Sequence, residues 1–211
     1  MQILYGFLLA LMIAYLAFRA HSLNSSGAFA AVVVGTVVFG LGGLSWSVLL
    51  MVFFITSSAL SRMFKQRKRG LDEKFSKGHE RDAGQVFGNG GLATAFVVVH
   101  ALYPESGLGW VGFAAALAAV NADTWATELG VLNPYPPRLI TQMNQVVEKG
   151  TSGGVSLIGT FASLAGAFAI ALPASFFTQN WSLLFIISLA GLAGSLFDSL
   201  LGATVQAMYY C

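Results

Sequence analysis

The stretch from Leu108 to Glu128 reads LGWVGFAAALAAVNADTWATE. A helix needs about 20 consecutive, mostly apolar residues to cross the hydrocarbon core of a bilayer, and this stretch meets that length. Its polar side chains Asn121, Asp123 and Glu128 are confined to the second half. The stretch therefore predicts a transmembrane helix that carries two acids near one end.

Six further segments have a similar length and composition: Ile3–Phe18, Gly27–Leu44, Trp46–Phe64, Phe87–Tyr103, Val155–Phe177 and Trp181–Leu201. Of the 211 residues, 56% are hydrophobic and 9% are charged, whereas a soluble domain carries about 25% charged residues. We therefore expect an all-α polytopic transmembrane helical bundle of about seven spans, folded as a single integral membrane domain over residues 1–211.

Composition and charge exclude several classes of protein. The net charge of +2 is too small to indicate a nucleic-acid partner. The single cysteine, Cys211, excludes a disulfide within the chain and a zinc site built on cysteines, and we interpret it as a bystander thiol. Arg19 follows the first apolar run instead of preceding it, so we interpret that run as a retained helix and not as a cleaved signal peptide.

The distribution of basic residues predicts the orientation in the membrane. Eight of the eleven lysines and arginines lie between Arg62 and Arg81. Because loops rich in lysine and arginine stay in the cytoplasm, the loop at about 62–84 is expected inside. With seven spans, the N-terminus is then outside, the C-terminus is inside, and the loop at about 129–154 is also cytoplasmic.

This topology gathers four polar clusters at the cytoplasmic face. They are RDAGQVFGNGG at 81–91, NADTWATELG at 121–130, EKGTSGG at 148–154 and SLFDSLLG at 195–202. Intramembrane acids are costly and usually face a partner, a cavity or a functional site. Asp123, Glu128 and Asp198 facing one cavity would repel each other unless a cation lay between them, and Mg²⁺ takes carboxylate and phosphate oxygens. The alternative is that these acids pair with arginine or backbone groups and only fix helix packing.

The cluster at 148–154 is suited to phosphate. Lys149 supplies a cation, and Gly150, Thr151, Ser152, Gly153 and Gly154 precede a helix, whose N-terminus favours anions. The spacing of a P-loop is missing, and the same residues also make an ordinary loop and helix cap. The run Gly88–Gly91 either breaks its helix to admit a ligand or serves close packing. Asn89 within that run, and Arg81 before it, are further candidates for phosphate binding.

Five strings occur in an order that resembles one integral membrane family. They are RDAGQVFGNGG, ADTWATELG, PRLIT, GTSGGVSLIGT and AGSLFDSLLGATVQ. The family includes the plant phytyl-phosphate kinases and is distantly similar to dolichol kinases and CDP-diacylglycerol synthases. It continues past the position of Cys211 with a further polar motif and a last hydrophobic segment, so we expect this chain to be a short or partial member.

The resemblance implies a kinase that uses CTP, or another nucleoside triphosphate, to convert an isoprenyl or phytyl monophosphate to the diphosphate. It implies Mg²⁺ held by Asp123, Glu128 and Asp198, with Asp123, Lys149 and Asp198 as catalytic residues. The binding residues it implies for nucleotide and lipid phosphate are Arg81, Asn89, Gly150, Thr151, Ser152, Gly153 and Gly154. The expected location is a prokaryotic cell membrane or a plastid-type membrane.

Two other functions stay open. A cytidylyltransferase would use the same site to attack the α-phosphate of CTP and release pyrophosphate. A transporter of an anionic or phosphorylated substrate is disfavoured because its binding groups would lie near the middle of the membrane. The sequence leaves the chain length of the lipid, the nucleotide and the oligomeric state open.

Overall fold

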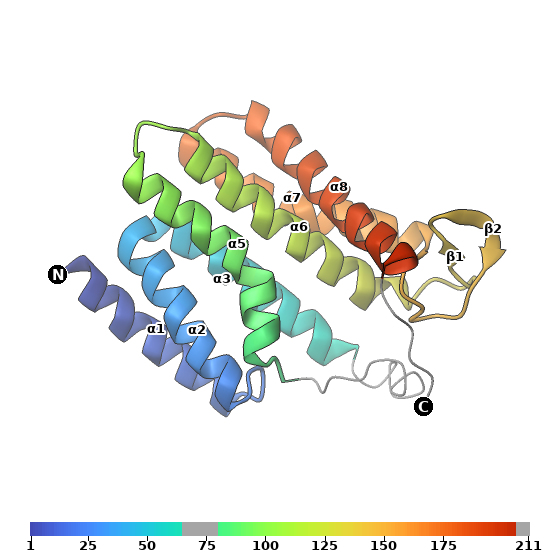
Figure 1. Cartoon of the computed structure of the whole chain (residues 1–211), viewed down its shortest axis with the longest axis horizontal. Helices are drawn as coiled ribbons and strands as arrows, with labels where there is room; N and C mark the ends of the chain where they lie inside the picture. Colours follow the sequence, from blue (N-terminus) through green and yellow to red (C-terminus); the bar gives the residue numbers. More distant parts are fainter. Residues whose placement is uncertain (65–79, 206–211) are drawn as a thin grey trace.

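The computed structural model describes residues 1–64 and 80–205. Most of the predicted basic loop, and Cys211, lie outside the described residues. The long helices are α1 (Gln2–Arg19), α2 (Ser25–Val37), α3 (Leu44–Met63), α5 (Ala83–Leu102), α6 (Leu108–Gly130), α7 (Leu157–Thr178) and α8 (Ser182–Thr204) (Figure 1). A π-helical turn, η1 (Val38–Gly42), extends α2, so that Ser25–Gly42 forms one segment of membrane length.

The expected all-α membrane bundle is confirmed. Six helical segments of the described chain are long and apolar enough to cross a membrane. The seventh long helix is α6, which spans 23 residues and carries the polar side chains of the stretch 108–128. The departure from a purely helical chain is a small sheet in the loop before α7, formed by β1 (Arg138–Leu139), β2 (Gln142–Val146) and β3 (Gly154–Val155).

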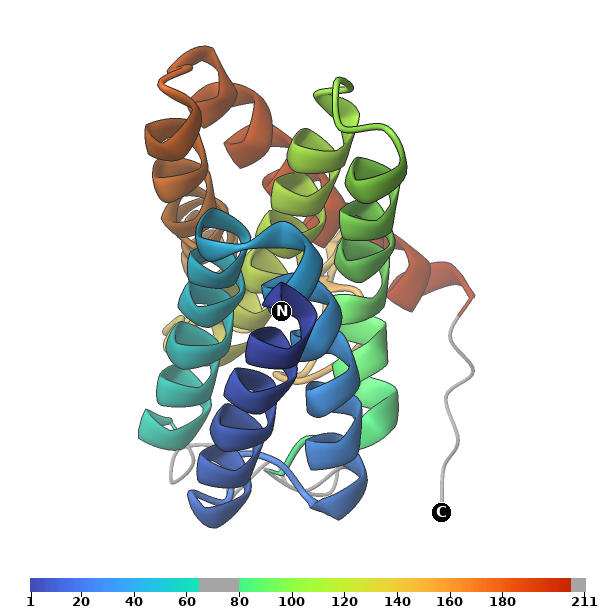
Figure 2. The ribbon, with the colours of Figure 1, turned by 90° about the vertical axis from the view of Figure 1, so that its left-hand side faces the viewer.

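Helix α6 lies at the centre of the bundle. It packs against α7, α8, α5 and α3, and Figure 1 shows it running between α5 and α8. Its residues Phe113, Leu117, Ala118 and Ala122 are fully buried. Helices α1 and α2 pack on each other at one side of the bundle, where Figure 2 shows α1 in front. The more polar helix is thus the one that the other helices shield from lipid.

The helix ends expected on the cytoplasmic side, here called the inner ends, are joined by hydrogen bonds near the turn between α1 and α2. The backbone N–H of Arg81 donates to the carbonyl oxygen of Ser22 at 3.1 Å, and the N–H of Asn24 donates to the carbonyl of Arg81 at 3.1 Å. Ser61 near the end of α3 donates to Glu128 near the end of α6. Arg62 of α3 also donates to the hydroxyl of Ser22, so the ends of α1, α2, α3, α5 and α6 that the charge pattern assigns to the cytoplasm lie at the same end of the bundle.

Helix α5 begins earlier than the apolar pattern predicts. The expected start was Phe87, but the helix starts at Ala83 because Asp82 and Gln85 form a reciprocal capping box. The helix runs without a break through Gly88–Gly91, so the alternative of a helix broken there is wrong. A Cβ at Gly90 would lie 3.3 Å from Val34, which shows close packing at this glycine.

Glycines allow α8 to approach α6 closely. A Cβ atom at Gly191 would lie 2.6 Å from Cβ of Ala167 and 2.9 Å from Cβ of Ala118. At Gly194, it would lie 2.6 Å from Cβ of Ala119. Small residues at such contacts let membrane helices pack through their backbones, where lipid supplies no hydrophobic drive for association.

We predict that Gly191→Val destabilises the bundle, because the added side chain has no room between α6, α7 and α8. The expected cost is about 1–3 kcal/mol, typical of overpacking. The matched control is Gly91→Ala on α5, where an added Cβ meets no atom within 4 Å of the described structure. Thermal unfolding in detergent should show a lower Tm for Gly191→Val and an unchanged or higher Tm for Gly91→Ala. Equal Tm values would contradict the close α6–α8 contact.

Candidate functional site

The central feature of the candidate site is a pair of acids on two neighbouring helices. Asp123 on α6 and Asp198 on α8 lie close enough for their carboxyl groups to repel each other. The pairing follows from the glycine contacts, because Asp123 lies one helical turn beyond Ala119, and Asp198 one turn beyond Gly194. Asp123 is half-buried and Asp198 is exposed, so this pair is accessible from one side.

The loop at 148–154 packs against the inner end of α8, just beyond Asp198. An added Cβ at Gly202 would collide with the hydroxyl of Ser152. At Gly153, which has φ of +77°, it would lie 2.8 Å from the Cα of Ala203. A left-handed glycine with no space for a side chain explains the Gly-rich composition of this loop. The structure therefore brings the expected phosphate segment to the same helix end as the acid pair.

Lys149 is hydrogen-bonded to the end of α6, and its expected phosphate-binding role stays a prediction. Its Nζ donates to the carbonyl oxygen of Val131 at 3.0 Å and to that of Asn133 at 2.6 Å. These carbonyls follow the end of α6, where a cation is favoured by the helix dipole. Lys149 thus fastens the loop to the end of α6.

Two of the backbone N–H groups expected to bind phosphate donate instead to carbonyl oxygens within the loop. The N–H of Thr151 donates to the carbonyl of Glu148, and the N–H of Gly154 donates to the carbonyl of Thr151. The backbone of the loop is held in a tight turn by these bonds. Gly150 is exposed and has a positive φ, whereas Gly153 is buried against α8.

Glu128 is not part of the acid pair. It is 6% exposed and accepts a hydrogen bond of 2.7 Å from the hydroxyl of Ser61. Within residues 1–64 and 80–205, no group of three or more His, Cys, Asp or Glu side chains is placed to hold a metal ion. The physical reason is helical geometry, because five residues rotate a side chain by about 140° away from Asp123. The predicted three-carboxylate metal set is therefore not assembled here.

Asn121 is a buried packing residue. Its Nδ2 donates to the carbonyl of Gly166 on α7 at 2.8 Å, and its Oδ1 accepts from Thr56 and Ser57 on α3, each at 3.2 Å. The side chain is fully buried. It joins three helices at membrane depth, where each unsatisfied polar group would cost several kcal/mol.

Arg81 and Asn89 line a pocket between α1, α2, α3 and α5, and not the contact between α6 and α8. The guanidinium of Arg81 lies over the rings of Phe53 and Phe54, with Cζ 5.6 and 5.8 Å from the ring centroids. Burial lowers the pKa of Arg81 below its usual range, and the carboxylate of Glu128 opposes that shift. Arg81 therefore interacts with Glu128. The predicted site residues fall into two groups, Asp123 with Asp198 and Arg81 with Glu128 and Asn89.

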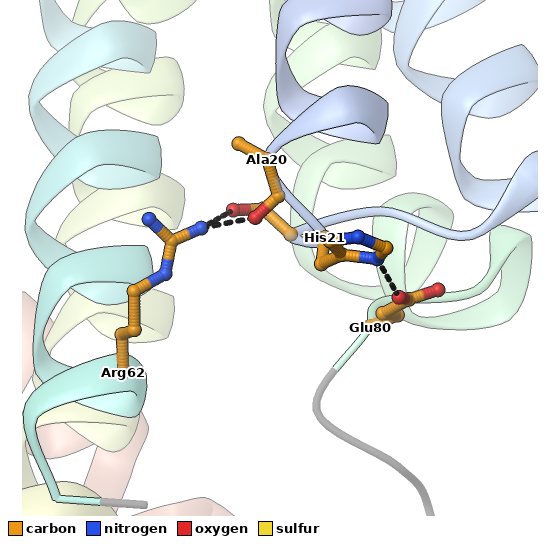
Figure 3. Close-up of polar contacts among 5 residues, drawn as sticks. Ala20, His21, Arg62 and Glu80 are labelled. Atoms are coloured by element: carbon orange, nitrogen blue, oxygen red, sulfur yellow. Dashed lines mark hydrogen bonds and ion pairs between the residues drawn. The ribbon is translucent and has the colours of Figure 1, made fainter.

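Contacts that the sequence did not indicate surround Arg81. Figure 3 shows Arg62 of α3 reaching the turn after α1, where it donates to the carbonyl of Ala20 and, at 3.1 Å, to the hydroxyl of Ser22. His21 Nδ1 and Glu80 Oε1 are 2.7 Å apart. The sequence indicated Arg62 only as part of a basic cytoplasmic loop. The signal that could have been read is the spacing of Asp82 and Gln85, which predicts a capping box and therefore a helix that starts directly after this loop.

Comparisons with known proteins place these features in a family. The family model described as "Integral membrane protein DUF92" matches residues 8–211. Protein PGR of Arabidopsis thaliana is 33% identical over all of this chain and 81% of its own length. An uncharacterized membrane protein of Methanocaldococcus jannaschii, MJ0933, is 31% identical over 89% of this chain and 76% of its own length. Protein VTE6, chloroplastic, of Arabidopsis thaliana is 28% identical over 87% of this chain and 56% of its own length.

No solved structure matches the chain. The family resemblance drawn from the five sequence strings is confirmed by these matches. The relatives come from an archaeon and a plant, one of them from the chloroplast, and the expected multi-pass integral membrane location is confirmed.

We predict that Lys149→Met lowers stability because two carbonyls at the end of α6 lose their charged donor. The expected cost is about 1–3 kcal/mol, the range for hydrogen bonds to a charged group. Thermal unfolding measures it, and nucleotide affinity of the folded fraction should stay within twofold of wild type. An unchanged Tm together with a large loss of nucleotide affinity would favour the phosphate-binding role.

Proposed function

The chain belongs to the integral membrane family DUF92, and from that premise we propose that it is a phosphotransferase acting on a prenyl monophosphate at the cytoplasmic membrane face. The expected donor is CTP or another nucleoside triphosphate, and the expected product is the prenyl diphosphate. The five family strings support this reaction class. The observation that carries the proposal is the pair of acids, Asp123 and Asp198, on facing helices at the inner end of the bundle.

The donor set of this pair fits Mg²⁺. Two carboxylates that repel each other at membrane depth are stabilised by a cation between them. Mg²⁺ is commonly held by one or two carboxylates together with substrate phosphates, so two protein ligands are sufficient here. When bound, the ion would neutralise charge on the nucleotide phosphates. We accordingly propose Asp123 and Asp198, without Glu128, as the metal ligands.

The remaining work of the site is positioning. A phosphate oxygen of the lipid attacks the γ-phosphorus of the nucleotide, and the bond from that phosphorus to the β–γ bridging oxygen breaks, so the nucleoside diphosphate leaves. The attacking oxygen of a phosphate dianion carries no proton, so no general base is required. Such reactions are accelerated mainly by alignment and charge stabilisation. Gly150, which is exposed in the loop that packs on the end of α8, is proposed to contact the nucleotide phosphates.

Product analysis tests the proposal directly. Purified protein is incubated with geranylgeranyl or phytyl monophosphate, Mg²⁺ and each nucleoside triphosphate, and the products are identified by mass spectrometry. Prenyl diphosphate with a nucleoside diphosphate supports the kinase. Pyrophosphate with a cytidylylated lipid would instead establish a cytidylyltransferase on the same site. No turnover by folded protein, with transport of the lipid phosphate in sealed vesicles, would overturn both enzymatic alternatives.

We predict that Asp123→Asn reduces turnover by about 100-fold or more, because a preorganised charge contact at the reacting phosphates is lost. Removal of the repulsion with Asp198 should leave the Tm of the metal-free protein unchanged or higher. The matched control is Glu105→Gln, which neutralises an exposed acid in the loop between α5 and α6 and should keep full activity. Near-normal activity of Asp123→Asn would refute its role.

A further inference from the structure

An apolar pocket lies between α1, α2, α3 and α5, on the side of the bundle shown in Figure 2. Its cavity volume is about 70 Å³, and its lining is almost entirely apolar. Its walls include Ile13, Leu50 and Phe54, and its lining follows α1 from Ala10 to Ala17, which is about 10 Å along that helix. The pocket therefore extends along α1 toward the inner end of the bundle.

The pocket has a cation at its inner end. Arg81 precedes α5 and lines this pocket together with Asn89. The same Arg81 also lines a second pocket, of about 100 Å³, whose other lining residues include Ser58, Ser61 and Arg62. The second pocket lies at the turn after α1, the region drawn in Figure 3. An apolar space and a polar space therefore meet at one guanidinium.

The charges facing the polar pocket are suited to a phosphate dianion. Arg62 and Arg81 contribute two guanidinium groups, while His21 and Glu80 face each other as a pair. Glu128 offsets part of the charge of Arg81. The guanidinium of Arg81 lies over the rings of Phe53 and Phe54. Arginine presents these groups in a fork that matches phosphate oxygens.

We propose that these two pockets form one binding site for a single-chain lipid phosphate, with the hydrocarbon chain between α1, α2, α3 and α5 and the phosphate at Arg81 and Arg62. A phosphate monoester carries a charge of about −1.5 to −2 at pH 7, which two guanidinium groups balance. An inorganic anion would leave the apolar pocket unused, and a neutral prenol would form no ion pair with Arg81 or Arg62. The identity of this lipid as the acceptor of the phosphoryl group rests on the proposed function.

Photoaffinity labelling tests the site without turnover. The probe is a prenyl monophosphate that carries a diazirine on its chain, incubated with the full-length protein in nanodiscs without nucleotide. The labelled peptides are identified by mass spectrometry. The site predicts labels on α1, α2 or α3, and competition by unlabelled geranylgeranyl monophosphate but not by geranylgeraniol, inorganic phosphate or two-chain phosphatidic acid. Labels confined to α7 and α8, or equal competition by phosphatidic acid, would overturn it.

Two variants separate the two halves of the site. Ala31→Phe fills the apolar pocket, and Ala165→Phe is the matched control at an exposed position of α7 outside the pocket. Ala31→Phe should weaken binding of a twenty-carbon prenyl phosphate at least tenfold but leave a five-carbon one nearly unchanged, while Ala165→Phe changes neither. Arg81→Met should weaken both, and Arg81→Lys should restore part of the affinity. Equal affinities of Ala31→Phe and Ala165→Phe for the long chain would overturn the pocket assignment.

Turnover distinguishes failure of this inference from failure of the proposed function. Labelling in the pocket by a protein that makes no prenyl diphosphate would leave the lipid-phosphate site standing and refute the kinase. Turnover whose KM for the long-chain lipid is unaffected by Ala31→Phe would leave the kinase standing and refute the pocket as its acceptor site.

Discussion

Every polar side chain at membrane depth needs a partner, because lipid offers none, and α6 carries three such side chains at the centre of the bundle. Asn121 is satisfied by bonds to α3 and α7, and Glu128 lies against Ser61 and near Arg81. Asp123 instead faces another acid, Asp198. Asn121 and Glu128 therefore serve helix packing, whereas Asp123 lies where only a proton or a cation relieves its repulsion with Asp198. This exception identifies the site more strongly than the Gly-rich loop beside it.

The two groups of functional side chains lie on different faces of α6. The acid pair faces α8 and the loop at 148–154, while Arg81 faces the pocket walled by α1, α2, α3 and α5. In the proposed reaction the nucleotide arrives from the cytoplasm and the lipid from the bilayer, and their phosphates must meet at the inner end of α6. In the proposed arrangement, the inner end of α6 separates the nucleotide from the hydrocarbon chain.

The sequence was sufficient to predict the membrane bundle and the convergence of polar clusters, since both follow from apolar length and from the distribution of arginine and lysine. It could not predict which polar residues meet. The spacing of five residues puts Asp123 and Glu128 on different faces of α6, but it does not say which helices pack against each face. Lys149 shows the same limit, because its carbonyl partners, Val131 and Asn133, follow from the path of an irregular loop. The early start of α5 was readable, because the spacing of Asp82 and Gln85 is a capping box.

The central claim is that Asp123 and Asp198 act together as one divalent-cation site. Its most direct measurement is Mn²⁺ binding, followed by electron paramagnetic resonance of the purified protein with and without CTP, in wild type and in Asp123→Asn and Asp198→Asn. The account predicts one bound Mn²⁺ per chain that is tightened by CTP and is weakened by either substitution to a similar degree. Equal Mn²⁺ affinity in all three proteins, or a loss in only one variant, would contradict a shared site.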